Sequence, residues 1–254
     1  MKALLLVMAA ALTLAAAPAW AGTEVDTVTR KPDGRKRVSK AYFDGERLRV
    51  DTSDGRRAIV YRGDTGVIWV IDHKKQNYIE VEKPTADALA GQAQAQLDAL
   101  PPEKRSHAEL GAAVARGIEV RETQRTGKIL GVPCKEVQLV SGSMRIADVC
   151  QASYADAGVD PATFAAVRDL QELLGGSLSA LLPKETREEG MAALESFARL
   201  EGVPMRVRTY EEGALDTETV VTRLEKKPIP KGTFALPKGY APKFSINIRN
   251  PSAN

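Results

Sequence analysis

The residues of this chain with the most distinctive spacing for covalent chemistry are its two cysteines, Cys134 and Cys150. They are symmetric about Gly142, which lies in a Ser-Gly-Ser segment typical of a turn. In a hairpin centred on that glycine the cysteines stand directly opposite each other, with Cα atoms about 4.5 to 5.5 Å apart, which a disulfide accepts. A redox-active pair is the alternative, but the spacing is not Cys-x-x-Cys and no thioredoxin-like pattern surrounds it. We expect a structural disulfide.

Side chains for acid–base catalysis or metal binding show no such pattern. Neither of the two histidines, His73 and His107, has a second His, a Cys or paired carboxylates nearby at metal-ligand spacing. The Gly-x-Ser-x-Gly, Ser-x-x-Lys and His-Glu-x-x-His motifs are absent from the sequence. Adjacent carboxylates such as Glu188-Glu189 and Glu211-Glu212 are typical of a helix start and a turn. We therefore expect a protein that is not an enzyme, with no metal site and no cofactor; a hydrolase with carboxylates distant in sequence has the least support.

The first 21 residues predict the cellular compartment of the protein. Lys2 precedes an uncharged apolar run from Ala3 to Ala17, and Ala19-Trp20-Ala21 has the small-x-small pattern of a signal-peptidase site. This is the organisation of a secretory signal peptide, and the run is too short and too Ala-rich for a good transmembrane helix. We expect cleavage near Ala21 and a mature chain, 22–254, that is soluble outside the cytoplasm and has no transmembrane segment. That compartment favours the disulfide.

Charge excludes another class of partner. The formal net charge is only +3, and acidic and basic residues alternate along the whole chain. The densest basic stretch, Arg30–Arg37, straddles a Pro-Asp-Gly turn. We interpret it as a solvated turn, with contact to an anionic surface as the alternative. Nucleic acid is not expected as a partner.

The elements that position these residues follow from the hydrophobic pattern. Between residues 35 and 82, short apolar or alternating runs are separated by turn signals such as Asp44-Gly45 and Asp54-Gly55, which predicts four or five antiparallel strands. Val67–Ile71 is apolar throughout, so we expect that strand to be covered on both faces. Further strands are predicted at 118–124, 132–140, 144–150, 203–210 and 215–226, before a proline-rich, irregular tail. We expect 35–82 and 203–226 to share one sheet.

Helices are expected to cover that sheet. Capping residues and apolar stripes predict them at 85–100, 106–116, 161–174 and 187–200. If the sheet and the helices at 161–174 and 187–200 enclose a cavity, its wall is expected to include four large side chains: Trp69, Phe164, Leu170 and Phe197. The alternative is that the same side chains meet and fill an ordinary core.

Several segments resemble a known group of envelope proteins. Tyr42–Val81 is similar to the strand meander of periplasmic lipoprotein carriers, and three short motifs resemble the uncharacterised periplasmic family called domain of unknown function 4412. Those motifs are Gly131–Cys134, Leu100–Arg105 and Pro237–Tyr240. The resemblance implies an α+β fold in which a strongly curved antiparallel sheet, a LolA/LolB-like half-barrel, wraps around helices as a single domain over 22–254. It transfers no catalytic residue.

Together these observations predict a periplasmic, non-enzymatic binding protein whose ligand is a lipid, an acyl chain or a lipoprotein. The alternative is an envelope protein-interaction or stress-sensing module with a filled core and no ligand cavity. The two differ in one measurable respect, because a continuous apolar pocket of at least about 300 Å³ would favour the binding protein.

Overall fold

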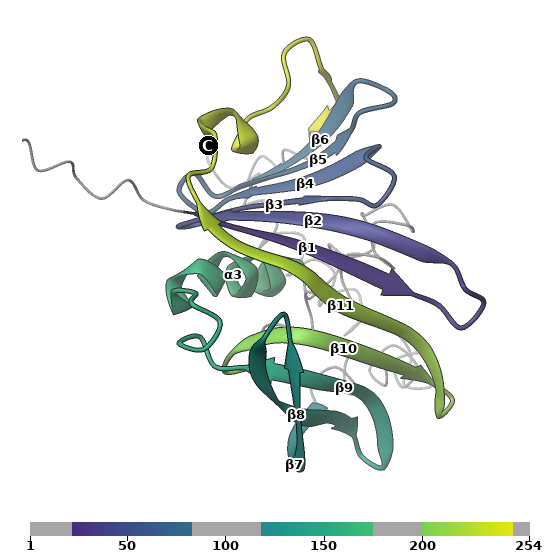
Figure 1. Cartoon of the computed structure of the whole chain (residues 1–254). Helices are drawn as coiled ribbons and strands as arrows, with labels where there is room; N and C mark the ends of the chain where they lie inside the picture. The colour runs from purple at the N-terminus through teal and green to yellow at the C-terminus, as the bar shows by residue number, and fades with distance from the viewer. Residues whose placement is uncertain (1–21, 83–117, 175–199, 246–254) are drawn as a thin grey trace, which may run out of the picture.

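One large sheet dominates the computed structural model, which describes residues 22–82, 118–174 and 200–245 (Figure 1). Twelve strands form it, in the order β12-β6-β5-β4-β3-β2-β1-β11-β10-β9-β8-β7. All neighbours pair antiparallel except β12, which runs parallel to β6. The strands are β1 (Gly22–Arg30), β2 (Lys36–Asp44), β3 (Arg47–Asp51), β4 (Arg57–Arg62), β5 (Val67–Asp72), β6 (Asn77–Glu82), β7 (Ile118–Ile129), β8 (Val132–Ser141), β9 (Met144–Ala152), β10 (Val203–Glu211), β11 (Ala214–Lys227) and β12 (Ala241–Ser245).

The predicted sharing of one sheet by 35–82 and 203–226 is confirmed, because β2–β6 and β10–β11 belong to the same sheet. The strand that joins them, β1, was not predicted; it lies between β2 and β11 and pairs with both. The expected irregular tail is wrong at β12, where Ala241–Ser245 adds an edge strand beside β6. Pro242 is accommodated there because an edge strand can leave one side of its backbone unpaired.

The described fold is mostly β, and the sheet is neither closed nor strongly curled (Figure 1). The expected strongly curved half-barrel is therefore corrected to an open sheet whose end strands, β12 and β7, do not pair. Register shifts, which bend and twist strands, occur in the pairings among β7–β11 and between β1 and β11. The pairings from β1 through β6 have none, and in this half of the sheet a shift occurs only where the edge strand β12 pairs with β6.

Helical structure in the described residues is brief: the 3₁₀ turn η1 (Pro161–Phe164), the α-helix α3 (Ala165–Leu174) and the 3₁₀ turn η4 (Lys231–Phe234). The predicted start at Asp160 is confirmed, because its carboxylate accepts a hydrogen bond from the Ala162 backbone N–H at 2.9 Å. The helices expected at 85–100, 106–116 and 187–200, and the signal peptide, lie outside the described residues. Within those residues, no helix is long and apolar enough to cross a membrane.

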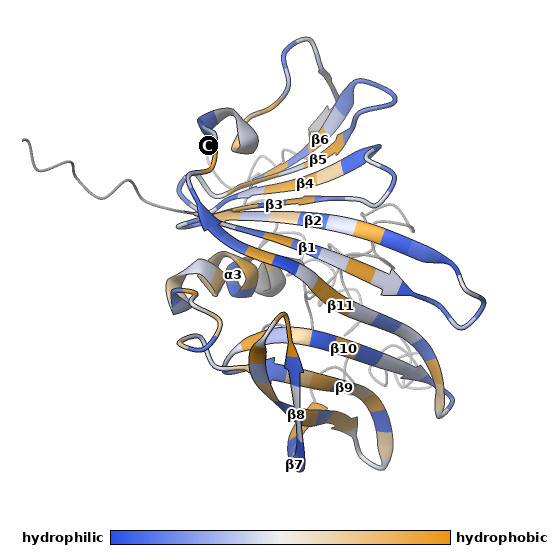
Figure 2. Ribbon diagram, in the orientation of Figure 1, coloured by the Kyte–Doolittle hydropathy of each residue, from blue (hydrophilic) through white to orange (hydrophobic). Residues whose placement is uncertain are grey.

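Apolar side chains cover both faces of the sheet. We call the face that carries α3 the inner face; there Phe164, Val167 and Leu170 pack into a large cluster with residues of β1–β5 and β10. On the opposite, outer face a smaller cluster is built by Ala58, Val60, Ile71, Ile229 and Phe234. Along β5, Ile68 and Val70 belong to the inner cluster and Ile71 to the outer one. The expected two-sided burial of this strand is thus confirmed, and Figure 2 shows its apolar character.

Candidate binding groove and its polar surroundings

The two cysteines form the expected disulfide, Cys134–Cys150, with Cα atoms 5.3 Å apart. The register differs from the one that predicted it, because Cys150 lies opposite Glu136 and Cys134 lies opposite Gly127 of β7. A register shift between Leu139 and Val140 moves the strands past each other, so the bond spans a diagonal pair. Its position among buried residues of the inner cluster is that of a structural bond.

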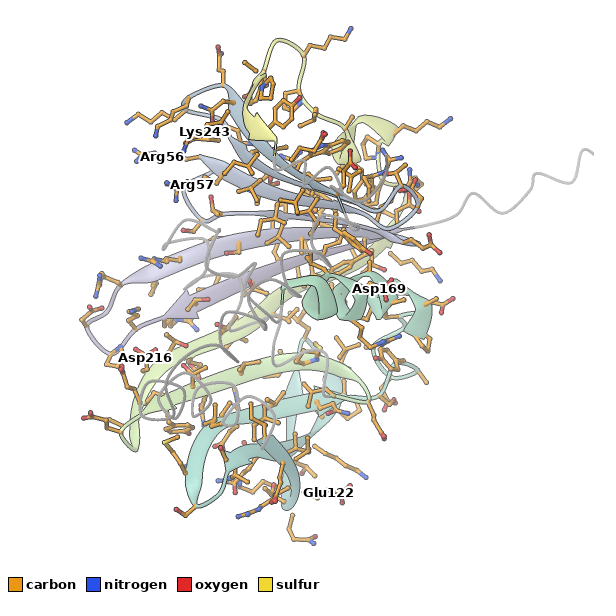
Figure 3. All side chains as sticks on the ribbon, turned by 180° about the vertical axis from the view of Figure 1, so that it is seen from behind. Arg56, Arg57, Glu122, Asp169, Asp216 and Lys243 are labelled. Carbon is orange, nitrogen blue, oxygen red and sulfur yellow. A yellow bond between two sulfur atoms is a disulfide. The ribbon has the colours of Figure 1, made fainter. Side chains whose placement is uncertain are left out.

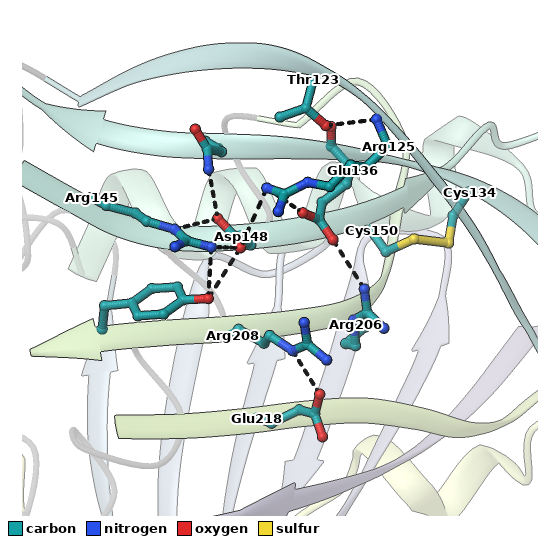
Figure 4. A network of polar contacts seen from close by, with 12 residues as sticks. Thr123, Arg125, Cys134, Glu136, Arg145, Asp148, Cys150, Arg206, Arg208 and Glu218 are labelled. Atoms are coloured by element: carbon teal, nitrogen blue, oxygen red, sulfur yellow. Dashed lines mark hydrogen bonds and ion pairs between the residues drawn. A yellow bond between two sulfur atoms is a disulfide. The ribbon is translucent and has the colours of Figure 1, made fainter. Parts of the chain in front are cut away.

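A network of ion pairs links side chains of β7–β11 (Figure 4). Its centre is two buried carboxylates, Glu136 and Asp148, with 5% and 2% of their surface exposed. Glu136 pairs with Arg125 at 2.6 Å and Arg206 at 3.0 Å. Asp148 accepts hydrogen bonds from Arg145 Nε at 2.7 Å and from the Tyr210 hydroxyl at 3.1 Å.

Buried carboxylates are candidates for acid–base catalysis, and sequence reasoning did not single these two out. Glu136 on β8 faces the guanidinium groups of Arg125 on β7 and Arg206 on β10, and Asp148 on β9 faces that of Arg145 on its own strand and, at 3.8 Å, that of Arg125. Such charge-assisted contacts link the strands. We therefore assign Glu136 and Asp148 to strand pairing. The signal that could have found them is alternation, because both stand among apolar residues of paired strands.

A second buried carboxylate cluster lies on β1. Glu24, 3% exposed, is paired with Lys227 at 2.5 Å and with Lys40 and Arg223 at 3.3 Å each. The hydrogen bond from Lys227, followed by that from Lys40, holds the pKa of Glu24 below its ordinary value and outweighs the effect of burial. These contacts join β1 to both of its neighbours in the sheet.

A groove of about 450 Å³ lies on the inner face, beside α3. One end is apolar, and its lining includes Val25, Ala41, Phe43, Leu48, Phe164 and Val167. The middle is lined by hydroxyl side chains: Thr27, Thr29, Ser39, Thr209, Thr217 and Thr219. The other end carries charge of both signs, from Lys31, Arg35, Arg37, Glu211 and Asp216. The groove is therefore amphipathic along its length.

In the middle of the groove, some of the lining hydroxyl groups hydrogen-bond to one another. The hydroxyls of Thr29 and Thr219 are 2.8 Å apart, and those of Thr209 and Thr217 are 2.7 Å apart. Because these cross-strand pairs hydrogen-bond each other, a ligand need not supply partners for them. An uncharged chain can pass these four threonines without breaking the hydrogen bonds between them.

The four expected wall residues are not brought together in one place. Phe164 lines the groove. Leu170 is fully buried in the same inner cluster but is not among the lining residues. Trp69 packs with the outer cluster instead, and its ring N–H donates to Glu80 at 2.7 Å. Phe197 lies outside the described residues.

The residues that sequence reasoning missed are those of β1. Val25, Thr27 and Thr29 alternate along this strand, and all three line the groove. Their alternation with Glu24, Asp26 and Val28 is a strand signal that the sequence does contain.

His73, which has no metal-ligand spacing in the sequence, has polar contacts in the structure. His73 Nδ1 lies 3.0 Å from the Tyr240 hydroxyl, and Nε2 lies 3.4 Å from an Arg49 nitrogen. Within the part of the chain that the structure describes, no three His, Cys, Asp or Glu side chains gather as a metal site would require. His107 lies outside that part.

Comparison with known proteins yields structural likeness only. No family model matches the chain, so the resemblance to domain of unknown function 4412 is not confirmed, and no curated protein matches it by sequence. An uncharacterized conserved protein from Thermus thermophilus is similar over 89% of this chain and 91% of its own, with 8% identity and a TM-score of 0.47. MucB in the MucA/MucB complex of Pseudomonas aeruginosa is similar over 84% and 54%, with 14% identity and a TM-score of 0.39. A LolA superfamily protein from Nitrosomonas europaea is similar over 85% and 90%, with 8% identity and a TM-score of 0.29.

Proposed function

We propose that this protein is a non-enzymatic binding protein of the cell envelope that holds the acyl chain of a lipid or lipoprotein in the inner-face groove. The single observation that carries the proposal is the groove itself, whose volume of about 450 Å³ falls within the range of roughly 300–1,000 Å³ typical of small-molecule sites. The proposal treats 1–21 as a signal peptide, 22–254 as one domain and the periplasm as the compartment.

The form of the groove fits an amphiphile. Its apolar end, with Phe164 from η1 and Val25 and Leu48 from the sheet, can take a hydrocarbon chain by burial alone, at about 25 cal/mol per Å² of apolar surface. Its charged end can take a polar head. The alternative protein-interaction module with a filled core predicts no such space beside α3.

A steric test can block the groove without changing charge. Ala41 is half-buried on the inner face of β2 and lines the apolar end. Ala41→Trp should weaken binding of a fluorescent fatty acid at least tenfold, because the indole occupies the path of the chain. Thr27→Trp, one strand over, repeats the block at the start of the hydroxyl section.

The matched control uses the other face of the same strand. Val38 on β2 is 54% exposed and is not among the groove-lining residues, so Val38→Trp should leave the dissociation constant unchanged. Circular dichroism establishes which variants are folded. No fatty-acid binding by the wild type, or equal binding by folded Ala41→Trp, overturns the proposal and leaves the interaction module.

A further inference from the structure

Basic residues gather at one end of the sheet. Three turns meet there, between β1 and β2, β3 and β4, and β5 and β6. Residues 31–37, 52–57 and 72–76, which form and flank these turns, contain eight Lys or Arg and three Asp. We call this set of turns the cationic rim. Its surplus of five positive charges exceeds the formal net charge of +3 of the whole chain.

The opposite end of the same strands has no such surplus. The turns between β2 and β3 and between β4 and β5, residues 44–47 and 62–66, contain two arginines and three acidic residues. Arginines pair locally at both ends: Arg47 with Asp44 and Arg62 with Asp64 here, and Arg35 with Asp33 and Arg56 with Asp54 at the rim. The two ends thus differ in net charge. The positive charge is therefore a property of one end of the sheet and not of its turns in general.

The cationic rim also has a shape that can receive anions. A depression of about 440 Å³ lies within it, lined by Arg37, Arg56, Arg57, Lys74 and Lys75 together with Asp54, Asp72 and two hydroxyl residues. Figure 3 shows Arg56 and Arg57 at the same end of the sheet as Asp216, which lines the charged end of the groove. Arg37 borders both spaces, so the depression adjoins the groove.

Exposed apolar side chains lie at the same end. Val38 near the start of β2, Met144 at the start of β9 and Leu215 near the start of β11 are 54%, 51% and 42% exposed. Each stands within two residues of a strand end next to a turn at this end of the sheet. Val38 lies beside Arg37 of the rim, whereas Leu215 and Met144 lie farther along the same end, in the β7–β11 half. Cations and exposed apolar side chains at one end of a molecule are the composition of a surface that enters the headgroup region of a bilayer.

We propose that the cationic rim docks on the anionic surface of a phospholipid bilayer and so places the charged end of the groove against the lipid. This rests on the proposed function, since docking there gives an acyl chain a short path between bilayer and groove. Lipid phosphates meet the lysines and arginines of the rim. The positive charge is confined to the β1–β6 half, because the turn between β10 and β11 and the strand residues beside it carry the carboxylates of Glu211, Glu212 and Asp216. This asymmetry fixes how the molecule is tilted on the surface.

A bilayer fits these features better than an acidic protein does. An acidic protein would satisfy the cations, but it gives no role to the exposed Val38, Met144 and Leu215. It would also cover the charged end of the groove without supplying a ligand, whereas a bilayer both satisfies the cations and supplies the acyl chain.

The test is vesicle flotation with the full mature protein. Wild type should float with vesicles of phosphatidylcholine containing 30% phosphatidylglycerol, and the bound fraction should fall as salt is raised because exposed charges are screened. It should not float with phosphatidylcholine alone. Lys36, Lys74 and Lys75 are exposed rim residues, and none of them lines the groove. Since each lysine near an anionic surface contributes roughly fivefold to partitioning, K36E/K74E/K75E should lose at least about a hundredfold.

A control variant with the same net charge separates placement from total charge. K128E/K226E/K231E reverses three exposed lysines of β7, β11 and η4, all away from the rim, and should bind vesicles within about threefold of wild type. Equal losses in the two triple variants, binding to soluble polyglutamate without binding to the vesicles, or no flotation by wild type would each overturn the docking proposal. Fatty-acid binding without vesicles is measured in parallel and should be unchanged in K36E/K74E/K75E. Its absence in wild type would count against the groove and not against docking.

Discussion

Replacing Phe164 by alanine distinguishes a groove wall from a filled core. The ring is 4% exposed, lies 5.2 Å from the ring of Phe43 and 5.9 Å from that of Tyr154, and also lines the groove. Phe→Ala in a core costs about 3–5 kcal/mol, a sum of lost burial and a newly created void. Here the void merges with existing space, so we expect the low end, about 3 kcal/mol. For a chain of this size that is a fall of roughly 6–12 °C in Tm.

The same substitution on the other face is the matched control. Phe234 is 1% exposed in the outer cluster, with the Arg47 guanidinium 5.2 Å from its ring centre. It does not line the groove, so Phe234→Ala should cost more, about 4–5 kcal/mol, and leave ligand binding unchanged. Urea denaturation with a fixed m-value gives both free energies of unfolding.

Ligand chain length supplies the second measurement. Removing the Phe164 ring lengthens the apolar end of the groove, so Phe164→Ala should accept fatty acids longer than the longest that wild type accommodates. Each added methylene that becomes buried should gain about fourfold in affinity, from roughly 0.8 kcal/mol per CH₂. Equal destabilisation by Phe164→Ala and Phe234→Ala, together with identical chain-length profiles, would refute the reasoning and make Phe164 a core residue.

Two further predictions concern what holds the sheet together. Thiol titration in denaturant without reductant should find no free thiol, and replacing both Cys134 and Cys150 by alanine should lower the free energy of unfolding by about 3 kcal/mol, as for a loop of this length; two free thiols would contradict it. Glu24→Gln should cost about 3 kcal/mol at pH 7, because it leaves the cations around Glu24 without their buried partner. Since the folded-state pKa of Glu24 lies below its ordinary value of 4.5, this difference should hold above about pH 4.5 and shrink as the pH falls through the folded pKa. If the difference in unfolding free energy between wild type and Glu24→Gln grew as the pH was lowered, this prediction would be wrong.

Alternation and turn dipeptides were sufficient to predict β2–β6 and β8–β11, because each of these strands buries at least one face. They do not mark the start of β1, because no turn dipeptide precedes Thr23 and the signal-peptide pattern ends just before it. β12 was missed for a different reason. A short strand containing Pro242, paired along one side only, has almost no local signature.

The groove was less predictable than the sheet. When a strand is apolar on both faces, periodicity does not show which side chains point toward the groove and which point to the opposite face. Trp69 and Ile68 are adjacent and both apolar, yet they pack in clusters on opposite faces. Phe164 lies in η1 and lines the groove, and the segment predicted as a helix at 161–174 has one apolar stripe, so only one of its faces can meet the sheet. The disulfide was predicted through a register that is shifted in the structure, and it formed because a diagonal pair is also within reach.

The position of β1 has a consequence for how the chain acquires its structure. β1 pairs with β11, and the paired residues are about 190 positions apart in the sequence, as Thr29 and Thr219 are. Contacts so distant in sequence form slowly, because a long loop must close before any of them is gained. During synthesis β1 emerges before the other described strands, yet one of its two edges stays unpaired until β11 has also emerged. The two halves of the sheet can therefore be joined only after β11 has emerged, and a chain that stops before Ala214 leaves β1 and β10 as open edges able to pair with another chain.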